Sequence, residues 1–121
     1  MKHWILTGIA LAALAVVIGA FGAHIIKDRV SQNDLRIFET GVKYQFYHAL
    51  GIILIGILGF HYNPADLESS SRFMVAGIGI FSGSLYALVL TGNRWLGAIT
   101  PIGGICFIIG WILLFIKIRA S

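Results

Sequence analysis

The sequence predicts an all-α integral membrane protein, a four-helix bundle with a short interfacial amphipathic helix between spans one and two. Three observations support this fold class. Hydrophobic residues make up 58% of the 121 residues and charged residues only 12%, about half the share found in soluble domains. Four stretches stay apolar for about 20 residues, the length that crosses a hydrocarbon core of about 30 Å. None of them alternates between polar and apolar residues as the strands of a membrane β-barrel do.

The first span is expected over residues 4–26, between Lys2 and Lys27. Its apolar run exceeds the about 7–15 residues of a signal-peptide core, so we interpret it as a retained helix. The other spans are expected at residues 44–61, 73–91 and 95–116, and the whole chain, 1–121, forms one membrane domain. Basic residues lie mostly at the span ends, where lipid head groups would meet them. The formal charge of +4 therefore does not indicate nucleic-acid binding.

Residues 31–43 separate the first two spans. Ser31 followed by Asp34 fits a helix start, with a hydroxyl cap and a carboxylate near the positive helix end. Apolar and charged residues then occupy different faces at helical spacing: Leu35, Phe38 and Val42 against Arg36, Glu39 and Lys43. This pattern predicts an interfacial amphipathic helix that runs into the second span, with a bend at Gly41 as one option.

The later connections differ in kind. Residues 62–72 are turn-rich, with Asn63-Pro64 and three serines that can cap the third helix. The connection near residues 91–95 is very short, so the third and fourth helices should form an antiparallel hairpin. Pro101 is expected either to kink the fourth helix or to start it after a Thr100 cap.

Small residues recur every four positions on two spans, Ala15, Gly19 and Ala23 on the first and Gly79, Gly83 and Ala87 on the third. Such faces let helix backbones approach closely in lipid. Tight helix packing is the first interpretation, and lining a passage for a substrate is the alternative. A homo-oligomer formed through these faces is also compatible with the pattern.

Four sequence blocks carry a resemblance to a known family. They are GAFGAH at 19–24, TGVKYQFYHAL at 40–50, FSGSLY at 81–86, and ITPIGG at 99–104 with Gly110-Trp111. In this order they resemble the YgdD/YwdK-like family of small, uncharacterised bacterial membrane proteins. The resemblance covers nearly the whole chain and implies a multi-pass protein of the bacterial plasma membrane. It supplies no reaction.

Polar side chains inside spans are costly, so each needs a partner or a purpose. His24, near the end of the first span, and His48, near the start of the second, should lie at similar depth in an antiparallel pair. The sequence therefore predicts a polar cluster near one membrane face as the candidate binding site. Besides the two histidines it would contain Glu39, Tyr44, Gln45, Ser82, Ser84, Tyr86 and Thr100.

Three interpretations of this cluster stay open. The polar groups can bond one another and fix the helix register. They can instead form a lipid head-group or ligand pocket around His24, His48, Tyr44 and Gln45. Both histidines, with Glu39 as a third ligand, could also hold a metal or haem. Structural zinc needs four ligands, so no metal site and no cofactor is predicted.

The chain has no nucleophile elbow, phosphate loop or paired catalytic carboxylates. The remaining acidic residues are expected to be solvated loop charges: Asp28, Asp34, Asp66 and Glu68. No catalytic residue is predicted, and an enzyme is the minority interpretation. We expect a non-enzymatic plasma-membrane protein that contacts membrane lipids and binds lipid or a small partner. The alternatives are a small oligomeric transporter or ion-conducting protein and, less favoured, a histidine-ligated metal or haem protein.

Basic residues divide almost evenly between the two sides of the predicted bundle, so the positive-inside rule nearly cancels. With four spans both termini must share a side. A cytoplasmic location of the termini is favoured.

Overall fold

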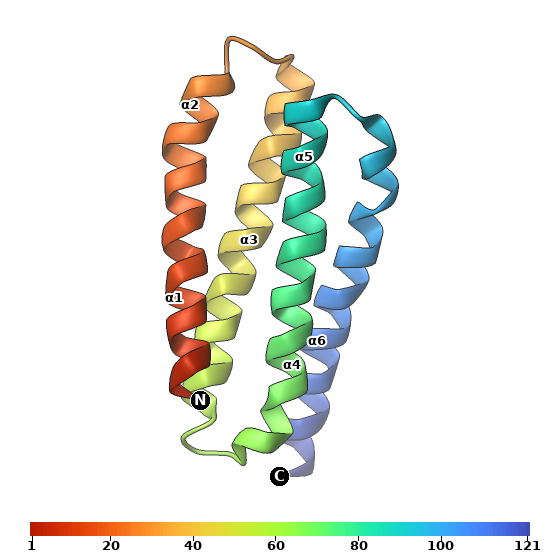
Figure 1. Ribbon diagram of the computed structural model, residues 1–121. Helices are drawn as coiled ribbons and strands as arrows, with labels where there is room; N and C mark the ends of the chain where they lie inside the picture. The colour runs from red at the N-terminus through yellow and green to blue at the C-terminus, as the bar shows by residue number, and fades with distance from the viewer.

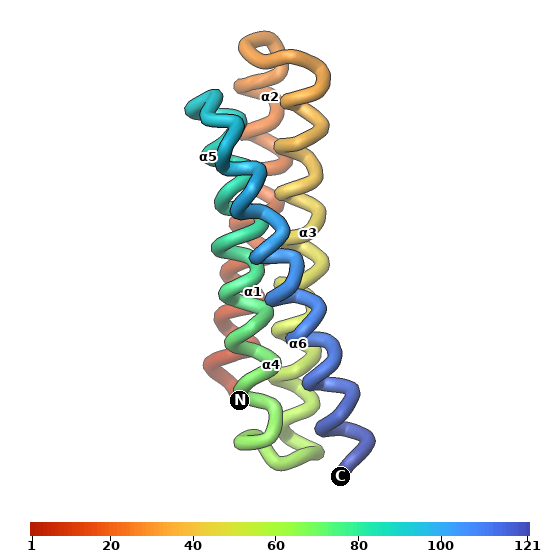
Figure 2. The backbone as a smooth tube through the Cα atoms, turned by 90° about the vertical axis from the view of Figure 1, so that its right-hand side faces the viewer, coloured from red at the N-terminus to blue at the C-terminus, as the bar shows by residue number.

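The computed structural model describes all 121 residues as four long helices that run antiparallel along one axis (Figures 1 and 2). Each is long and apolar enough to cross a membrane, which confirms the predicted all-α, four-span class. The first comprises α1 (Lys2–Val17), a π-helical turn (Ile18–Gly22) and α2 (Ala23–Ile26), and the second is α3 (Gln32–Leu58). The third comprises α4 (Pro64–Gly77), a π-helical turn (Ile78–Ser82) and α5 (Gly83–Thr91), and the fourth a 3₁₀ turn (Arg94–Ala98) and α6 (Thr100–Ala120).

The amphipathic segment of residues 31–43 is helical and continuous with the second span. The Ser31 hydroxyl accepts a hydrogen bond from the Asp34 N–H at 3.1 Å and caps α3 as expected. The helix does not break at Gly41, and it lies parallel to the other spans rather than across the membrane interface (Figure 1). Its apolar side is covered within the bundle, where Phe38 packs on Tyr86. The amphipathic helix thus runs into the second span as predicted, whereas the expectation that it lies in the membrane interface is corrected.

The third helix begins earlier than predicted. Asn63 accepts a hydrogen bond from the Ala65 N–H at 3.1 Å, and Pro64 occupies the first turn, where its missing N–H costs nothing. The prediction that serines cap this helix is wrong, because Ser70 and Ser71 lie inside α4 and are fully buried.

The fourth span begins with the 3₁₀ turn, and Pro101 lies in the first turn of α6. Of the two roles predicted for Pro101, the helix start is confirmed. Thr100 belongs to the helix and is not its N-cap, which is Ile99.

Glycines mark the closest helix contacts. A Cβ on Gly8 of α1 would lie 2.7 Å from the Ala49 carbonyl oxygen of α3, and Gly103 of α6 lies directly against the backbone of Phe81. The predicted small face of the first span does pack, since Ala15 is 1% exposed. A Cβ added at Gly79 or Gly83, by contrast, would meet no other atom within 4 Å. Tight packing through the third-span face is therefore wrong within this chain.

The bundle is open rather than closed. α1 packs along α3, and α6 packs along α4, so the outer helices each rest mainly on one neighbour. Only 11% of the residues in the most apolar stretch of the first helix are buried, against 44% in the corresponding stretches of the second and third helices. The main core lies between α3, α4 and α6 and includes Ile52, Ile55, Met74 and Phe107. Most of the first helix is thus left for lipid or another partner.

Candidate functional site

The predicted polar residues do not form one cluster. The structure distributes most of them among three separate connections between helices and leaves His24 and Glu39 without a hydrogen bond.

The first connection centres on Gln45, which is 2% exposed. Its Nε2 donates to the Leu11 carbonyl oxygen of α1 at 2.9 Å, and its Oε1 accepts from the Tyr86 hydroxyl of α5 at 2.7 Å. Nearby, the Ser82 hydroxyl donates to the Gly41 carbonyl oxygen at 2.6 Å. Gln45 therefore ties three helices together, and each interhelical bond of this kind contributes about 0.6 kcal/mol in a membrane.

The second connection joins α3 and α6 through His48. Trp111 Nε1 donates to His48 Nε2 at 3.0 Å, and His48 Nδ1 lies 2.8 Å from the Tyr44 carbonyl oxygen. Indole can only donate and a carbonyl can only accept. The arrangement therefore assigns the neutral imidazole with its proton on Nδ1. Phe107 stacks on the ring with centroids 3.5 Å apart, so both nitrogens and one face of His48 are occupied.

Tyr44 contributes its backbone to this second connection, while its side chain is 39% exposed and packs against Phe81.

The third connection joins α5 and α6. The Ser84 and Thr100 hydroxyls lie 2.5 Å apart, and Ser84 donates to the Phe81 carbonyl oxygen at 2.9 Å. The Ser84 oxygen can thus accept a hydrogen bond from the Thr100 hydroxyl.

The two histidines lie at different depths. Gly22, two residues before His24, packs against Phe38. His48 follows Phe38 by ten residues of continuous helix, which is about 15 Å at a rise of 1.5 Å per residue. The expectation that both histidines share a depth is therefore wrong. No group of three or more His, Cys, Asp or Glu side chains could hold a metal ion.

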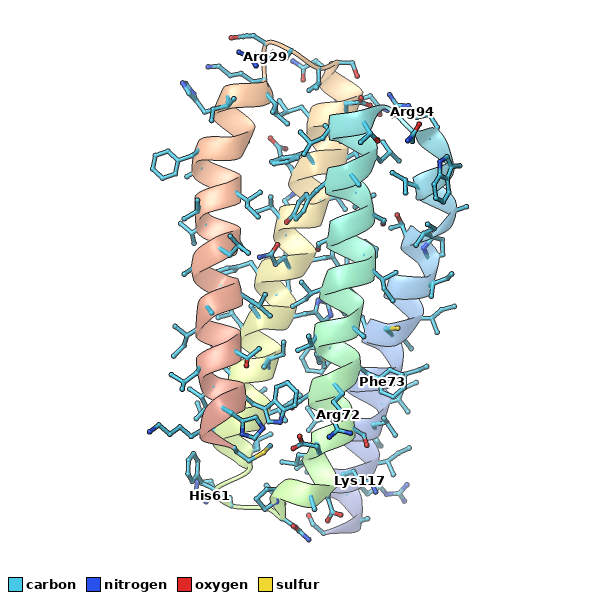
Figure 3. The ribbon with its side chains drawn as sticks, in the orientation of Figure 1. Arg29, His61, Arg72, Phe73, Arg94 and Lys117 are labelled. Atoms are coloured by element: carbon cyan, nitrogen blue, oxygen red, sulfur yellow. The ribbon has the colours of Figure 1, made fainter.

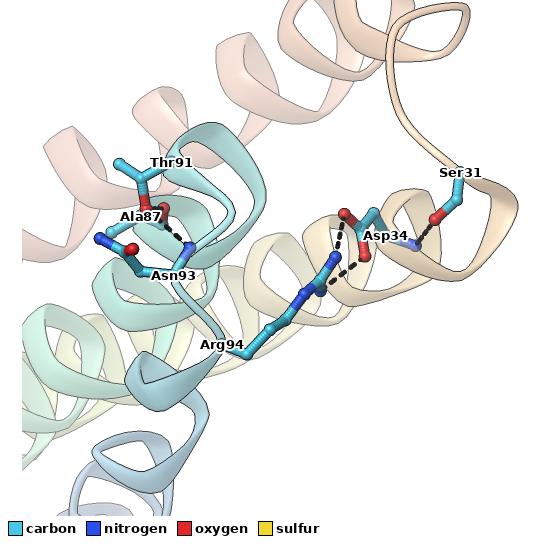
Figure 4. Close-up of polar contacts among 6 residues, drawn as sticks. All are labelled: Ser31, Asp34, Ala87, Thr91, Asn93 and Arg94. Carbon is cyan, nitrogen blue, oxygen red and sulfur yellow. Dashed lines mark hydrogen bonds and ion pairs between the residues drawn. The ribbon is translucent and has the colours of Figure 1, made fainter.

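Asp34 and Arg94 form a two-pronged ion pair that the sequence did not predict (Figure 4). Arg94 Nη1 donates to Asp34 Oδ1 at 2.8 Å and Nη2 to Oδ2 at 2.9 Å. Asp34 is 8% exposed, so its expected role as a solvated loop charge is wrong. The pair links the first turn of α3 to the connection before α6.

This ion pair lies outside the apolar part of the spans. A helix of 27 residues is about 40 Å long, which exceeds the hydrocarbon core of about 30 Å, so its terminal turns extend beyond the core. Asp34 lies in the first turn of α3, and Arg94 begins the 3₁₀ turn at the same end of the bundle. The hydrogen bonds from Arg94 lower the pKa of the Asp34 carboxyl, against the opposing effect of burial.

A second polar contact that was not predicted closes the other end of the molecule. Trp4 Nε1 donates to Glu68 Oε2 at 3.0 Å, and Arg72 Nη2 and His3 Nε2 lie 3.7 and 3.8 Å from Glu68 Oε1. Glu68 belongs to α4 rather than to a loop. It holds the start of α1 against α4 at the end where both termini lie (Figure 1).

An apolar groove separates α1 and α2 from α5, and we refer to it as the α1–α5 groove. Its volume is about 390 Å³, within the 300–1,000 Å³ typical of small-molecule sites. The only lining side chain with a polar tip is Tyr86, whose hydroxyl is engaged by Gln45. Arg29 lies in the turn that follows the first helix, at the end of the molecule opposite the two termini (Figure 3). The lining residues are Val17, Ile18, Phe21, Gly22, Ile25, Ile26, Phe38, Tyr86 and Leu90.

Comparisons with known proteins agree with this architecture. Residues 18–104 match the family described as "Protein of unknown function (DUF423)". The UPF0382 membrane protein of Staphylococcus epidermidis (strain ATCC 12228 / FDA PCI 1200) is 46% identical over 116 residues, which cover 96% of this chain and 94% of that protein. The UPF0382 membrane protein YwdK of Bacillus subtilis (strain 168) is 43% identical over 117 residues, with 96% and 95% coverage. The family resemblance predicted from the sequence blocks is confirmed, and no solved structure matches the chain.

Proposed function

We propose that this chain, which belongs to the DUF423 family and whose relatives are named membrane proteins, is a non-enzymatic lipid-binding protein of the bacterial plasma membrane. The ligand is one acyl chain of an anionic phospholipid, held in the α1–α5 groove. The observation that carries this proposal is an apolar groove that ends near an unpaired arginine, Arg29.

The groove suits a hydrocarbon chain because its walls offer no free polar group. Eight of its nine lining residues are hydrophobic, and α1 closes one side while Tyr86 and Leu90 of α5 close the other. An unfilled groove of this kind forfeits dispersion contacts along its lining. An acyl chain supplies those contacts without leaving a hydrogen bond unsatisfied.

The head group is assigned to the end where Arg29 lies. Arg29 follows Ile25 by four residues, and its N–H donates to the Ile26 carbonyl oxygen, which places it in the hydrogen-bonded turn directly after α2. Guanidinium binds phosphate through paired hydrogen bonds, and Arg29 has no carboxylate partner. An anionic phospholipid is therefore favoured over a neutral one.

The polar residues predicted as a binding cluster take a structural role in this proposal. Gln45, His48, Ser82, Ser84 and Thr100 are bonded within the bundle and set the helix register. The interior between α3, α4 and α6 is filled by side chains with no exposed surface, such as Ile52 and Met74. This filling supports a binding role over conduction through a single chain.

A glycine pair offers a matched test of the groove. Gly22 lines it, whereas Gly83 faces open space outside it. Native mass spectrometry after detergent washing should find one retained anionic phospholipid on the wild type and on Gly83→Leu, and none on Gly22→Leu. Equal retention by the two variants, or no retained lipid on the wild type, would contradict the proposal.

We also propose that both termini face the cytoplasm. Lys43 lies too deep to act as a loop charge. The end with the termini then carries Lys2, Arg72, Lys117 and Arg119, against Lys27, Arg29, Arg36 and Arg94 at the other end. The positive-inside rule is therefore balanced, and reporter fusions decide the orientation.

A further inference from the structure

The side of α3 that faces away from the bundle carries a continuous exposed stripe, which we refer to as the α3 stripe. Its members alternate by four and three positions, the spacing of a helix that packs along another helix in a left-handed pair. Every member is exposed, including Tyr47 at 55%, Leu50 at 47% and Ile57 at 48%. The stripe consists of Arg36, Thr40, Lys43, Tyr47, Leu50, Leu54 and Ile57.

Lys43 places a charge on this stripe well below the end of the first helix. Its neighbour Val42 packs against Gly19 of the first helix, and Gly19 lies eight residues before Lys27 at the end of that helix. Lys43 is therefore about 12 Å below the level of Lys27 at a rise of 1.5 Å per residue. Glu39, one turn from Lys43, borders the stripe, and both side chains are exposed.

Neither charge has a partner within the chain, because the three ion pairs present involve Glu68 and Asp34 as the acids. Charged side chains inside a membrane almost always face protein or a water-filled cavity and pair with another group. Bare lipid is thus a poor environment for this part of α3. A second polar surface against the stripe would give both charges a partner.

We propose that a second copy of the chain covers the α3 stripe. In a two-fold pair with its axis along the helices, the same surface meets itself. Glu39 of each copy then reaches Lys43 of the other, so the two charges that are unpaired in one chain are both neutralised. Because the same surface carries both an acid and a base, a second copy can pair both charges, which favours it over an unrelated protein.

The surface beside the stripe leaves room for the partner. A groove of about 370 Å³ lies between α1 and α3 next to Lys43 and Tyr47. Its first-helix wall consists of Ala15, Val16, Gly19 and Ala20. Val16 and Ala20 are exposed there, and the small side chain of Ala20 lets another helix approach closely. Phe38, which lines the α1–α5 groove, is buried on a different side of α3. The pairing surface is therefore separate from the proposed lipid site, and each proposal can fail alone.

A charge exchange tests the pairing. Glu39→Lys puts four cations at the two-fold axis and Lys43→Glu puts four anions there, so each variant alone should dimerise at least about tenfold more weakly than the wild type in liposomes. Mixed together, the two variants should dimerise as the wild type does, because each Lys again meets a Glu across the axis. Energy transfer between fluorophores on the C-termini measures both states.

The control is Lys27→Glu, which reverses an exposed charge away from the stripe and should leave dimerisation unchanged. A monomeric wild type in the bilayer would overturn the pairing. So would single variants that dimerise normally, or a mixture that stays monomeric although both variants are folded by circular dichroism.

Cysteine cross-linking gives a second measurement that needs no charge change. In a Cys106→Ser background, Tyr47→Cys should cross-link to itself in native membranes, because stripe residues lie next to the axis. Phe115→Cys, exposed on α6, should cross-link at least about tenfold less. Equal cross-linking at the two positions would contradict a specific α3 interface.

Discussion

Trp111 and His48 determine each other's hydrogen-bonding state across the interface of α3 and α6. The indole N–H donates to His48 Nε2 at 3.0 Å, and this leaves Nδ1 as the donor to the Tyr44 carbonyl oxygen. The imidazole is therefore neutral and oriented by two helices. It behaves as a packed, bonded core group rather than as a free ligand.

Trp111→Phe should destabilise the protein by about 1–2 kcal/mol, because His48 Nε2 loses its only donor and stays buried. The free energy of unfolding in mixed micelles, followed by circular dichroism, measures the change. Trp95→Phe is the matched control, since Trp95 is 64% exposed and makes no side-chain hydrogen bond. Equal losses for the two variants would show that the bond to His48 has no energetic role.

Gln45 and Tyr86 should show a coupled contribution to stability. A double-mutant cycle with Gln45→Leu and Tyr86→Phe is expected to give a coupling of about 0.6 kcal/mol, and at most about 1.7 kcal/mol, the range of interhelical bonds in membranes. Tyr47→Phe, on an exposed tyrosine without a hydrogen bond, should show no coupling to Gln45. Additive losses for Gln45 and Tyr86 would contradict the bond.

Two glycine-to-alanine changes should have opposite signs. Gly103→Ala drives a methyl group into the backbone of Phe81, and such overpacking costs about 1–3 kcal/mol. Gly79→Ala enters open space and should stabilise the helix by about 0.5–1 kcal/mol. Thermal unfolding of the two variants beside the wild type gives both signs, and a shared sign would refute the helix packing described for α6.

Asp34 should make stability depend on pH in acid. Its pKa is lowered in the folded state by Arg94, so its contribution is full above the unfolded pKa of about 3.9. It is lost as the pH falls through the lower, folded value. In an uncharged detergent, the wild type should lose more stability than Asp34→Asn below about pH 4. Asp28→Asn, at an exposed and unpaired carboxylate, should follow the wild type, and a wild-type curve parallel to that of Asp34→Asn would contradict the pairing.

Reporter fusions test the orientation. A C-terminal fluorescent protein that matures only in the cytoplasm should light up, and alkaline phosphatase fused after Ser121 should stay inactive. A fusion after Arg29 should give the reverse pair of results. Active phosphatase at the C-terminus would place the termini outside.

The sequence predicted the four spans well because hydrocarbon permits so few backbone arrangements. The start of an apolar run does not mark every helix start, however, since α3 and α4 begin earlier, at Gln32 and Pro64. It could not separate an interfacial helix at residues 31–43 from the first half of α3. An apolar side chain such as Phe38 can face either lipid or another helix. Only the contact of Phe38 with Tyr86 of α5 in the folded structure shows that it faces the bundle. Gly79 and Gly8 show the same limit, since spacing reveals a small residue but not which helix it faces.

The site was predicted less well than the fold. Gln45, His48, Ser84 and Thr100 were singled out as polar groups that need a purpose, and each makes a hydrogen bond. The bonds of Gln45 to Tyr86 and of Ser84 to Thr100 join residues of the predicted set, whereas the partners Leu11 and Trp111 lie outside it. One of the two side-chain hydrogen bonds of Gln45 goes to the backbone carbonyl of Leu11, and no pattern of side chains in the sequence reveals such a partner. The pairing of Asp34 with Arg94 spans 60 positions. One signal was available, because Trp111 brings an obligatory donor into an apolar span and therefore requires a buried acceptor.

The most direct test of the proposed function is to map where a lipid chain binds. The protein would be reconstituted with phosphatidylglycerol bearing a photoreactive group on its acyl chain, and the attachment sites identified by peptide mass spectrometry. We predict that most attachment falls on residues 17–26 and 86–90, and that Gly22→Leu abolishes this preference while Gly83→Leu keeps it. Attachment spread evenly over all lipid-facing residues, including Ile112 and Phe115 of α6, would contradict a lipid site in the α1–α5 groove.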